Sequence, residues 1–428
     1  MKEEKKDSTN QNTFPQHGTP WEDIRQDLHE LKKLDVDWMN HPLPGYVYYF
    51  GEEIKDNQLE AYNIYSAENG LGAGIAFFSL EKMLNDIYDW ARDLYHGPET
   101  MGMTFTSGGT ESLFEAIRTA RNRSRARGTT GRLNLVIPYT AHPAIDKAAQ
   151  IMEIDVVRVP VDAEFRADVD AMAAAINAQT FLILGSAVCY PYGVYDPIGK
   201  LGELALERDI WLHVDGCWGG FINPFAKQLG YPVPEWDLEV PGVMSLSADL
   251  HKFAFSTKGA SLMLQRYQEN KDRYETFSIN DWPCGTYETP AFQGSSGAGS
   301  IASAWAMIRF LANEGYLKTA KAAMDATVQL TDGVNAIKGL RDVRDGAPVE
   351  GNSMAFRSID PEVDIMAVAD VLDANGWHCS RMREPRAIKH SVTPHHLSGV
   401  EKFLKDAAAA VEKVRRMGLK GEYDERTY

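Results

Sequence analysis

Cysteines and long apolar runs are scarce in this chain of 428 residues, and basic residues are fewer than acidic ones. The four cysteines form no CxxC pair and fit no zinc-ligand spacing, so we expect a reducing compartment, no disulfide scaffold and no metal site. No uncharged apolar run reaches about 18 residues, and the polar start lacks the apolar core of a signal peptide, which predicts no transmembrane segment and a cytoplasmic location. The net charge of −16 disfavours nucleic acid as a partner.

Several motifs of nucleotide-binding and hydrolytic enzymes are also missing. The chain contains no GxxxxGK[ST] loop, no GxGxxG after a strand, no HExxH and no GxSxG. A dinucleotide-binding oxidoreductase, which the fold class alone would allow, therefore lacks its phosphate-binding motif.

From about residue 80 onwards, apolar runs of strand length alternate with segments of helical periodicity. We expect strands at 133–138, 155–160, 180–187, 209–215, 243–249 and 260–265, separated by helices. Because these strands are almost continuously apolar, the pattern predicts an α/β fold with a mostly parallel sheet that helices cover on both faces.

The composition changes along the chain predict three units. Residues 1–60 form an N-terminal tail and arm, 61–298 a large α/β domain, and 299–428 a smaller C-terminal α+β domain. The arm contains a helical pattern from Trp21 and the aromatic stretch 44–50. That stretch is either a short strand with one buried face or an arm that packs on something, such as a second subunit.

Four features at the ends of these elements are candidates for chemistry. The segment TSGGTES (106–112) precedes a helix that we expect to begin at Thr110, which suits an anion such as a phosphate, although a plain turn is the alternative. Asp215 ends an apolar strand, where open α/β sheets bind ligands and where a carboxylate can also cap a helix. Lys252 ends SADLHK, and a partly buried lysine there would have a lowered pKa and form a Schiff base; a solvated loop lysine is the alternative. His142 follows another strand and would either stack on a flat ring or stabilise a helix start.

An anion cradle, a carboxylate, a lysine and a flat stacking group together match the needs of pyridoxal 5′-phosphate (PLP). The phosphate binds a helix N-terminus, the carboxylate keeps the pyridine nitrogen protonated, and the lysine binds the aldehyde. The order and spacing of these residues make PLP the predicted cofactor.

Four sequence blocks resemble, in order, those of the fold-type I PLP enzymes of the group II decarboxylase superfamily, and within it the sphingosine-1-phosphate lyases. They are TSGGTES, HVDGCWGGF, SADLHKFAFSTKGAS and TYETPAFQGSSGAGSIASAW. The likeness runs from about Pro44 to the last helix. It implies that Lys252 is the Schiff-base lysine, that Asp215 pairs with the pyridinium nitrogen and that His142 stacks on the ring. The other cofactor-binding residues that it implies are Gly108, Gly109, Thr110, Ser186 and His251.

The resemblance also implies three further catalytic residues. Lys258 matches a second lysine typical of the lyases, and Tyr48 and Tyr190 match active-site tyrosines. Fold-type I enzymes share their sites between subunits, so the resemblance implies a homodimer in which the partner's arm supplies Tyr48. The expected reaction is a retro-aldol carbon–carbon cleavage of an amino alcohol or β-hydroxy amino acid. Two alternatives stay open: an L-amino-acid decarboxylase, and a PLP-binding protein without turnover.

The chain departs from the lyase pattern at two places. The lyases carry Asn-Pro-Leu-His where this chain has NGLGAG (69–74), and Ser-Arg-Pro-Gly where it has SSGA (295–298). The departures remove one histidine and one arginine, and arginine is a natural clamp for phosphate or carboxylate. We therefore expect a small-molecule amine substrate that is smaller than, or charged differently from, a phosphorylated long-chain base.

Overall fold

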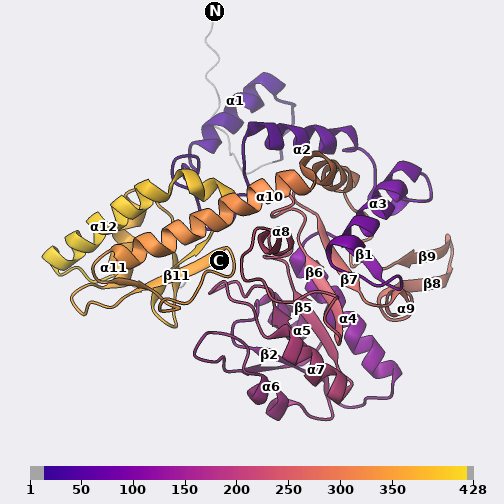
Figure 1. Cartoon of the computed structure of the whole chain (residues 1–428). Helices are drawn as coiled ribbons and strands as arrows, with labels where there is room; N and C mark the ends of the chain where they lie inside the picture. Colours follow the sequence, from indigo (N-terminus) through magenta and orange to yellow (C-terminus); the bar gives the residue numbers. More distant parts are fainter. Residues whose placement is uncertain (1–13, 422–428) are drawn as a thin grey trace, which may run out of the picture.

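The computed structural model describes residues 14–421, and Figure 1 shows their arrangement. A seven-stranded sheet with the strand order β1-β7-β6-β5-β4-β2-β3 forms the centre of the molecule. All of its strands run parallel except β7, which is antiparallel to both neighbours. The strands are β1 (Gly102–Thr106), β2 (Asn134–Pro138), β3 (Asp155–Val159), β4 (Thr180–Ser186), β5 (Trp211–Asp215), β6 (Val243–Ala248) and β7 (Ser261–Gln265).

Helices cover both faces of this sheet, as the continuous apolar strands predict. On β4, Leu182 and Leu184 belong to one buried cluster with α4 and α5, whereas Ile183 belongs to the cluster that contains residues of α6 and α7. Successive side chains of a strand point to opposite faces, so a run without polar residues fills both layers. The helices of this region are α3 (Phe78–Leu94), α4 (Gly109–Ala126), α5 (Ala144–Ile151), α6 (Val169–Ala175), α7 (Ile198–Arg208), α8 (Asn223–Gln228) and α9 (Gln268–Asn270).

A long helix, α10 (Ala298–Ala336), runs from the large sheet to a second one (Figure 1). It is kinked at Ala312, whose φ of 47° is not helical. The second sheet is antiparallel, has the order β10-β11-β13-β12 and is covered by two helices. These elements are β10 (Leu340–Asp342), β11 (Ser353–Ser358), α11 (Ile365–Ala374), β12 (Ser380–Met382), β13 (Ala387–Ser391), η3 (Pro394–Ser398) and α12 (Val400–Met417).

The fold class is confirmed, and most strands lie within two residues of the predicted bounds. The structure adds α2 (Glu52–Ile64), β1 and a hairpin of β8 (Phe277–Trp282) and β9 (Gly285–Thr289), which projects from the body in Figure 1. It also adds the short helices η1 (Gly70–Gly72) and η2 (Lys271–Glu275). The predicted helix start at Thr110 is displaced by one residue, because α4 begins at Gly109. The stretch 44–50 is not a strand.

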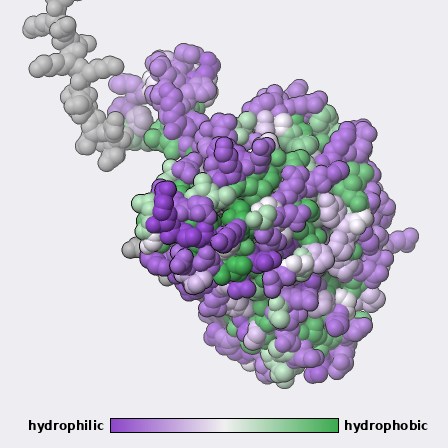
Figure 2. All heavy atoms as spheres, turned by 60° about the vertical axis from the view of Figure 1, so that its left-hand side comes forward, coloured by the Kyte–Doolittle hydropathy of each residue, from purple (hydrophilic) through white to green (hydrophobic). Residues whose placement is uncertain are grey.

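Large apolar side chains remain exposed on the surface of the single chain. The helix predicted from Trp21 is present as α1 (Trp21–Lys32), but none of its residues is buried. Further exposed residues are Ile75, Phe78 and Phe292. Figure 2 shows apolar patches between polar side chains on the face that it displays. Within residues 14–421, no helix combines the length and the apolar character needed to span a bilayer.

Candidate active site

A cavity of about 420 Å³ opens where the parallel strands of the large sheet end. The sheet register places Ser186 of β4 beside Asp215 of β5, and Asp215 beside Ser247 of β6. The loops after β1, β2, β4 and β6 therefore meet at this edge, where open α/β sheets bind ligands. The cavity brings together every site residue predicted from the sequence: Tyr48, Gly108, Gly109, Thr110, His142, Ser186, Tyr190, Asp215, His251, Lys252 and Lys258.

The start of α4 forms one end of the cavity. The first backbone N–H groups of an α-helix have no partner within the helix and attract an anion. Gly109 is required by close packing, since a Cβ atom there would lie 2.7 Å from Cys217 Sγ and 2.9 Å from Asp249 Oδ1. Next to it, the Glu111 carboxylate accepts hydrogen bonds from the Ser107 and Gln293 backbone N–H groups. This carboxylate therefore connects the loop before α4 with the segment that follows β9 through hydrogen bonds.

Lys252 forms an ion pair with a residue that the sequence reasoning missed. Its Nζ lies 2.9 Å from Asp249 Oδ2, and Asp249 also accepts a hydrogen bond of 2.6 Å from the Ser261 hydroxyl. Burial lowers the pKa of Lys252, but the Asp249 carboxylate outweighs it, and the pKa lies well above its usual value. The expectation of a lowered pKa at Lys252 was therefore wrong, because a carboxylate three residues away compensates for the burial of the ammonium.

His142 and Asp215 line the cavity, and each side chain accepts a hydrogen bond from a backbone N–H group. The His142 Nδ1 accepts the Ala144 N–H at 3.1 Å, so in the neutral ring the proton is on Nε2. Burial lowers the pKa of His142, which favours the neutral ring. Asp215 accepts the Cys217 N–H at 3.0 Å through Oδ1. The His142 ring therefore supports the start of α5, as one sequence-based interpretation has it, and its place in the cavity lining leaves the stacking role as a prediction.

Lys258 stands beside Lys252 at the mouth of the cavity. Its Nζ donates to the His251 carbonyl at 3.1 Å and lies 4.1 Å from the centre of the Tyr48 ring. Desolvation and the nearby Lys252 charge lower the pKa of Lys258 to about 8. The lysine with the lowered pKa at the cavity mouth is therefore Lys258 and not Lys252.

Tyr48 reaches the cavity of its own chain. Its ring packs edge-on against Phe253, with 5.5 Å between the ring centres, and lies 6.3 Å from Trp218. The prediction that a partner's arm supplies this tyrosine is not what the structure shows, because the arm folds back onto the body that follows it. Trp218 completes the aromatic side of the wall, and Cys217 lines the cavity next to it. Both belong to HVDGCWGGF, but nothing in their spacing distinguishes them from core residues.

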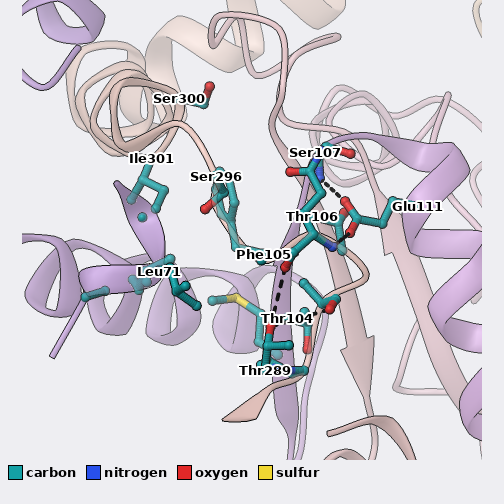
Figure 3. Close-up of a pocket in the computed structure, with 18 of the residues that line it drawn as sticks. Leu71, Thr104, Phe105, Thr106, Ser107, Glu111, Thr289, Ser296, Ser300 and Ile301 are labelled. Carbon is teal, nitrogen blue, oxygen red and sulfur yellow. Dashed lines mark hydrogen bonds between the residues drawn. The ribbon is translucent and has the colours of Figure 1, made fainter. Parts of the chain in front are cut away.

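A second cavity, of about 760 Å³, adjoins the first and shares Ser107 and Glu111 with it. Figure 3 shows these two residues on one wall and Leu71, Ser296 and Ile301 on the other. The two departures from the lyase pattern meet here. Asn69 Oδ1 accepts the Ser296 N–H at 3.1 Å, and a Cβ atom on Gly70 would lie 2.4 Å from Ser296 Oγ.

Comparison with known proteins agrees with this geometry. The conserved domain of the pyridoxal-dependent decarboxylases matches residues 4–340, and the chain therefore belongs to this family of PLP-dependent enzymes. Its relatives include the sphingosine-1-phosphate lyases of Oryza sativa subsp. japonica, 36% identical over 92% of this chain and 73% of the relative, and of Dictyostelium discoideum, 33% identical over 94% and 75%. The chain is accordingly a PLP-dependent lyase, and the family resemblance predicted from its sequence is confirmed.

Solved structures support the same assignment. The sphingosine-1-phosphate lyase of Burkholderia pseudomallei K96243 has a TM-score of 0.89 and 35% identity, with 94% of this chain and 93% of that chain covered. The glutamate decarboxylase of Lactobacillus brevis CGMCC 1306 has a TM-score of 0.83 at 19% identity over 95% and 96%, which shows the shared fold.

The chemistry of the cavity fits PLP. A helix start offers N–H groups for a phosphate, Lys252 offers an amine, and Asp215 offers a carboxylate, all on one cavity. Gly109 lets the start of α4 pack directly against Cys217 and Asp249, two residues that also line the cavity.

Proposed function

We propose that the enzyme cleaves the carbon–carbon bond of a small 1,2-amino alcohol or β-hydroxy amino acid by a retro-aldol reaction. The observation that carries this proposal is the position of Lys258 in the cavity lining, with its Nζ 4.1 Å from the centre of the Tyr48 ring. Its lowered pKa adds to this, because a larger share of the amine is neutral near neutral pH. Retro-aldol cleavage needs a base for the substrate hydroxyl proton, whereas decarboxylation does not.

We assign the following roles to the residues of the cavity. The first turn of α4 at Gly108–Thr110, with His251 nearby, holds the cofactor phosphate, Lys252 binds its aldehyde, and Asp215 holds a proton on its ring nitrogen. His142 stacks on the ring, and Ser186 lies at its edge. When bound, PLP supplies an electron sink for the bond that breaks at the amine-bearing carbon. Lys258 accepts the hydroxyl proton as the aldehyde forms, and Tyr48 and Tyr190 orient the substrate.

The second cavity supports a substrate other than a phosphorylated long-chain base. Its charged lining consists of the acidic Glu81, Glu111 and Glu288 and one cation, Lys271, whose Nζ donates to the Met103 carbonyl at 2.7 Å. A phosphate monoester carries close to two negative charges and needs several charged donors. Each lost charge-assisted hydrogen bond costs about 1.5–3 kcal/mol, so the loss of a histidine and an arginine weakens binding by about a hundredfold or more.

The deciding experiment measures aldehyde and carbon dioxide together. A panel of short β-hydroxy amino acids, aromatic amino acids and sphingosine-1-phosphate is supplied to the PLP-loaded enzyme. We expect aldehyde from a short substrate, with a kcat/KM above that for the phosphorylated lipid. Carbon dioxide without aldehyde would establish the decarboxylase alternative instead. A kcat/KM highest for the lipid would show that the two departures do not set the specificity.

We further propose a cytoplasmic homodimer built from the three predicted units, 1–60, 61–298 and 299–428. The exposed apolar side chains of Ile75, Phe78 and Phe292, which a single chain leaves in water, support self-association. The four unpaired cysteines, three of them buried, suit a reducing compartment. Sedimentation of the full chain tests the oligomeric state, and a fully active monomer would contradict the proposal.

A further inference from the structure

A buried lysine of the C-terminal sheet contacts the wall of the cofactor cavity. Lys389 lies on β13, is 6% exposed, and places its Nζ 2.9 Å from the centre of the Tyr190 ring. Tyr190 lines the cavity, whereas Lys389 stands behind it, outside the lining. Amine–aromatic contacts of this kind orient both partners.

The surroundings of Lys389 do not explain its burial as a structural ion pair. Within residues 14–421, no carboxylate lies within ion-pair distance of its Nζ, and its hydrogen-bond partner is the Ser391 hydroxyl. Burying an amine without an acidic partner costs folding free energy. If Lys389 served only to fill space, an apolar side chain would be more stable at this position. Burial lowers the pKa of Lys389 well below its usual value; the nearby Cys189 opposes this shift, and the Lys252 charge adds to it.

Lys389 also stands where three segments meet. The Ser391 carbonyl accepts the N–H of Gly45 in the arm at 3.0 Å. A Cβ atom on Gly45 would lie 3.4 Å from the Tyr190 hydroxyl. The arm, the loop after β4 and the C-terminal sheet therefore contact one another around the Tyr190 side chain.

We propose that Lys389 is a positioning residue of the lyase reaction, which holds the Tyr190 ring against the cofactor cavity through its amine. The inference rests on the proposed role of Tyr190 in orienting the substrate. The charged and titratable groups around the amine are Lys252, Cys189, the neighbouring His390 and, across the Tyr190 ring, His142, whose ring centre lies 6.3 Å from that of Tyr190. No bond is made or broken at Lys389.

The kinetic test is a double-mutant cycle of Lys389→Met and Tyr190→Phe. Misplacing a reacting group by about 1 Å costs up to about a hundredfold in rate, so we expect Lys389→Met to lower kcat by about 10- to 100-fold with little change in KM. In the Tyr190→Phe background, the same substitution should change kcat by less than about threefold. Lys402→Met is the matched control, since Lys402 lies 4.8 Å from the centre of the Trp377 ring, away from the cavity lining. An equal loss in both backgrounds, or a change in KM alone, would overturn the proposal.

A second test uses the protein without PLP and needs no turnover. With fluorotyrosine incorporated, the ¹⁹F signal of Tyr190, assigned by its absence in Tyr190→Phe, should shift as the Lys389 amine titrates below its usual pKa of 10.5. The shift should disappear in Lys389→Met and persist in Lys402→Met. Lys389→Met should also keep or raise the thermal midpoint, because it removes a buried amine. A Tyr190 signal unchanged by Lys389→Met would refute the inference even if the lyase reaction is confirmed, and a shift without lyase activity would locate the failure in the proposed function.

Discussion

The pH dependence of the reaction gives a sharp prediction for Lys258. With a pKa of about 8, about one tenth of the Lys258 amines are neutral at pH 7 and about nine tenths at pH 9. If the neutral amine accepts the hydroxyl proton, we expect kcat to rise about tenfold between these pH values. The active neutral form of any amine gains as the pH rises, and because desolvation lowers the pKa of Lys258 from 10.5 to about 8, the rise falls near pH 8.

Lys258→Met removes the amine and keeps an unbranched side chain of similar length. General base catalysis contributes about 10²- to 10⁴-fold, so kcat should fall by that factor and the rise around pH 8 should disappear. Lys147→Met, on the exposed side of α5, serves as the control and should change neither kcat nor its rise around pH 8. Aldehyde release followed at saturating amine between pH 6 and pH 10 gives the profile. A rise near pH 8 that persists in Lys258→Met would refute the assignment.

Three further substitutions or measurements test the rest of the site. Asp215→Asn should still bind PLP, seen by its absorbance, but should lose most activity because a neutral partner no longer favours a protonated ring nitrogen; near-normal turnover would contradict this role. Asp249→Asn leaves the Lys252 ammonium without its partner and should lower the unfolding free energy at pH 7 by about 3 kcal/mol in urea titrations. The double variant Asp249→Asn, Lys252→Met should regain part of this lost stability, because it also removes the buried ammonium. The pKa of Asp249 is lowered and that of Lys252 is raised. The difference in unfolding free energy between the wild type and Asp249→Asn should therefore persist through neutral pH and be lost as the pH falls below the usual carboxyl pKa of 3.8. A difference that grows on acidification would contradict the pairing.

The sequence predicted six of the seven strands of the large sheet and the residues that the fold brings together in the cavity. The helix at 198–208 has apolar residues at helical spacing, and the strand that ends at Asp215 is a short, fully buried run, so local pattern predicts both. The convergence of Asp215, Lys252 and His142 then follows from topology, since parallel strands end at one edge.

The elements that escaped prediction are those whose structure depends on distant contacts. The β8 strand has six exposed residues and no burial alternation, so periodicity gives no signal for it. Asp249 stands in the same motif as Lys252, but only the fold shows that its carboxylate turns toward the amine. Lys389 comes from another sheet altogether, and nothing in the local sequence links it to Tyr190.

Covalent trapping of the cofactor tests directly whether Lys252 binds PLP in this cavity. The PLP-loaded enzyme is reduced with borohydride, digested, and mapped by mass spectrometry for the pyridoxyl group. We expect the label on the peptide that contains Lys252, and no label in Lys252→Met. A label on Lys258 or Lys389 would contradict the assignment of the cofactor-binding lysine.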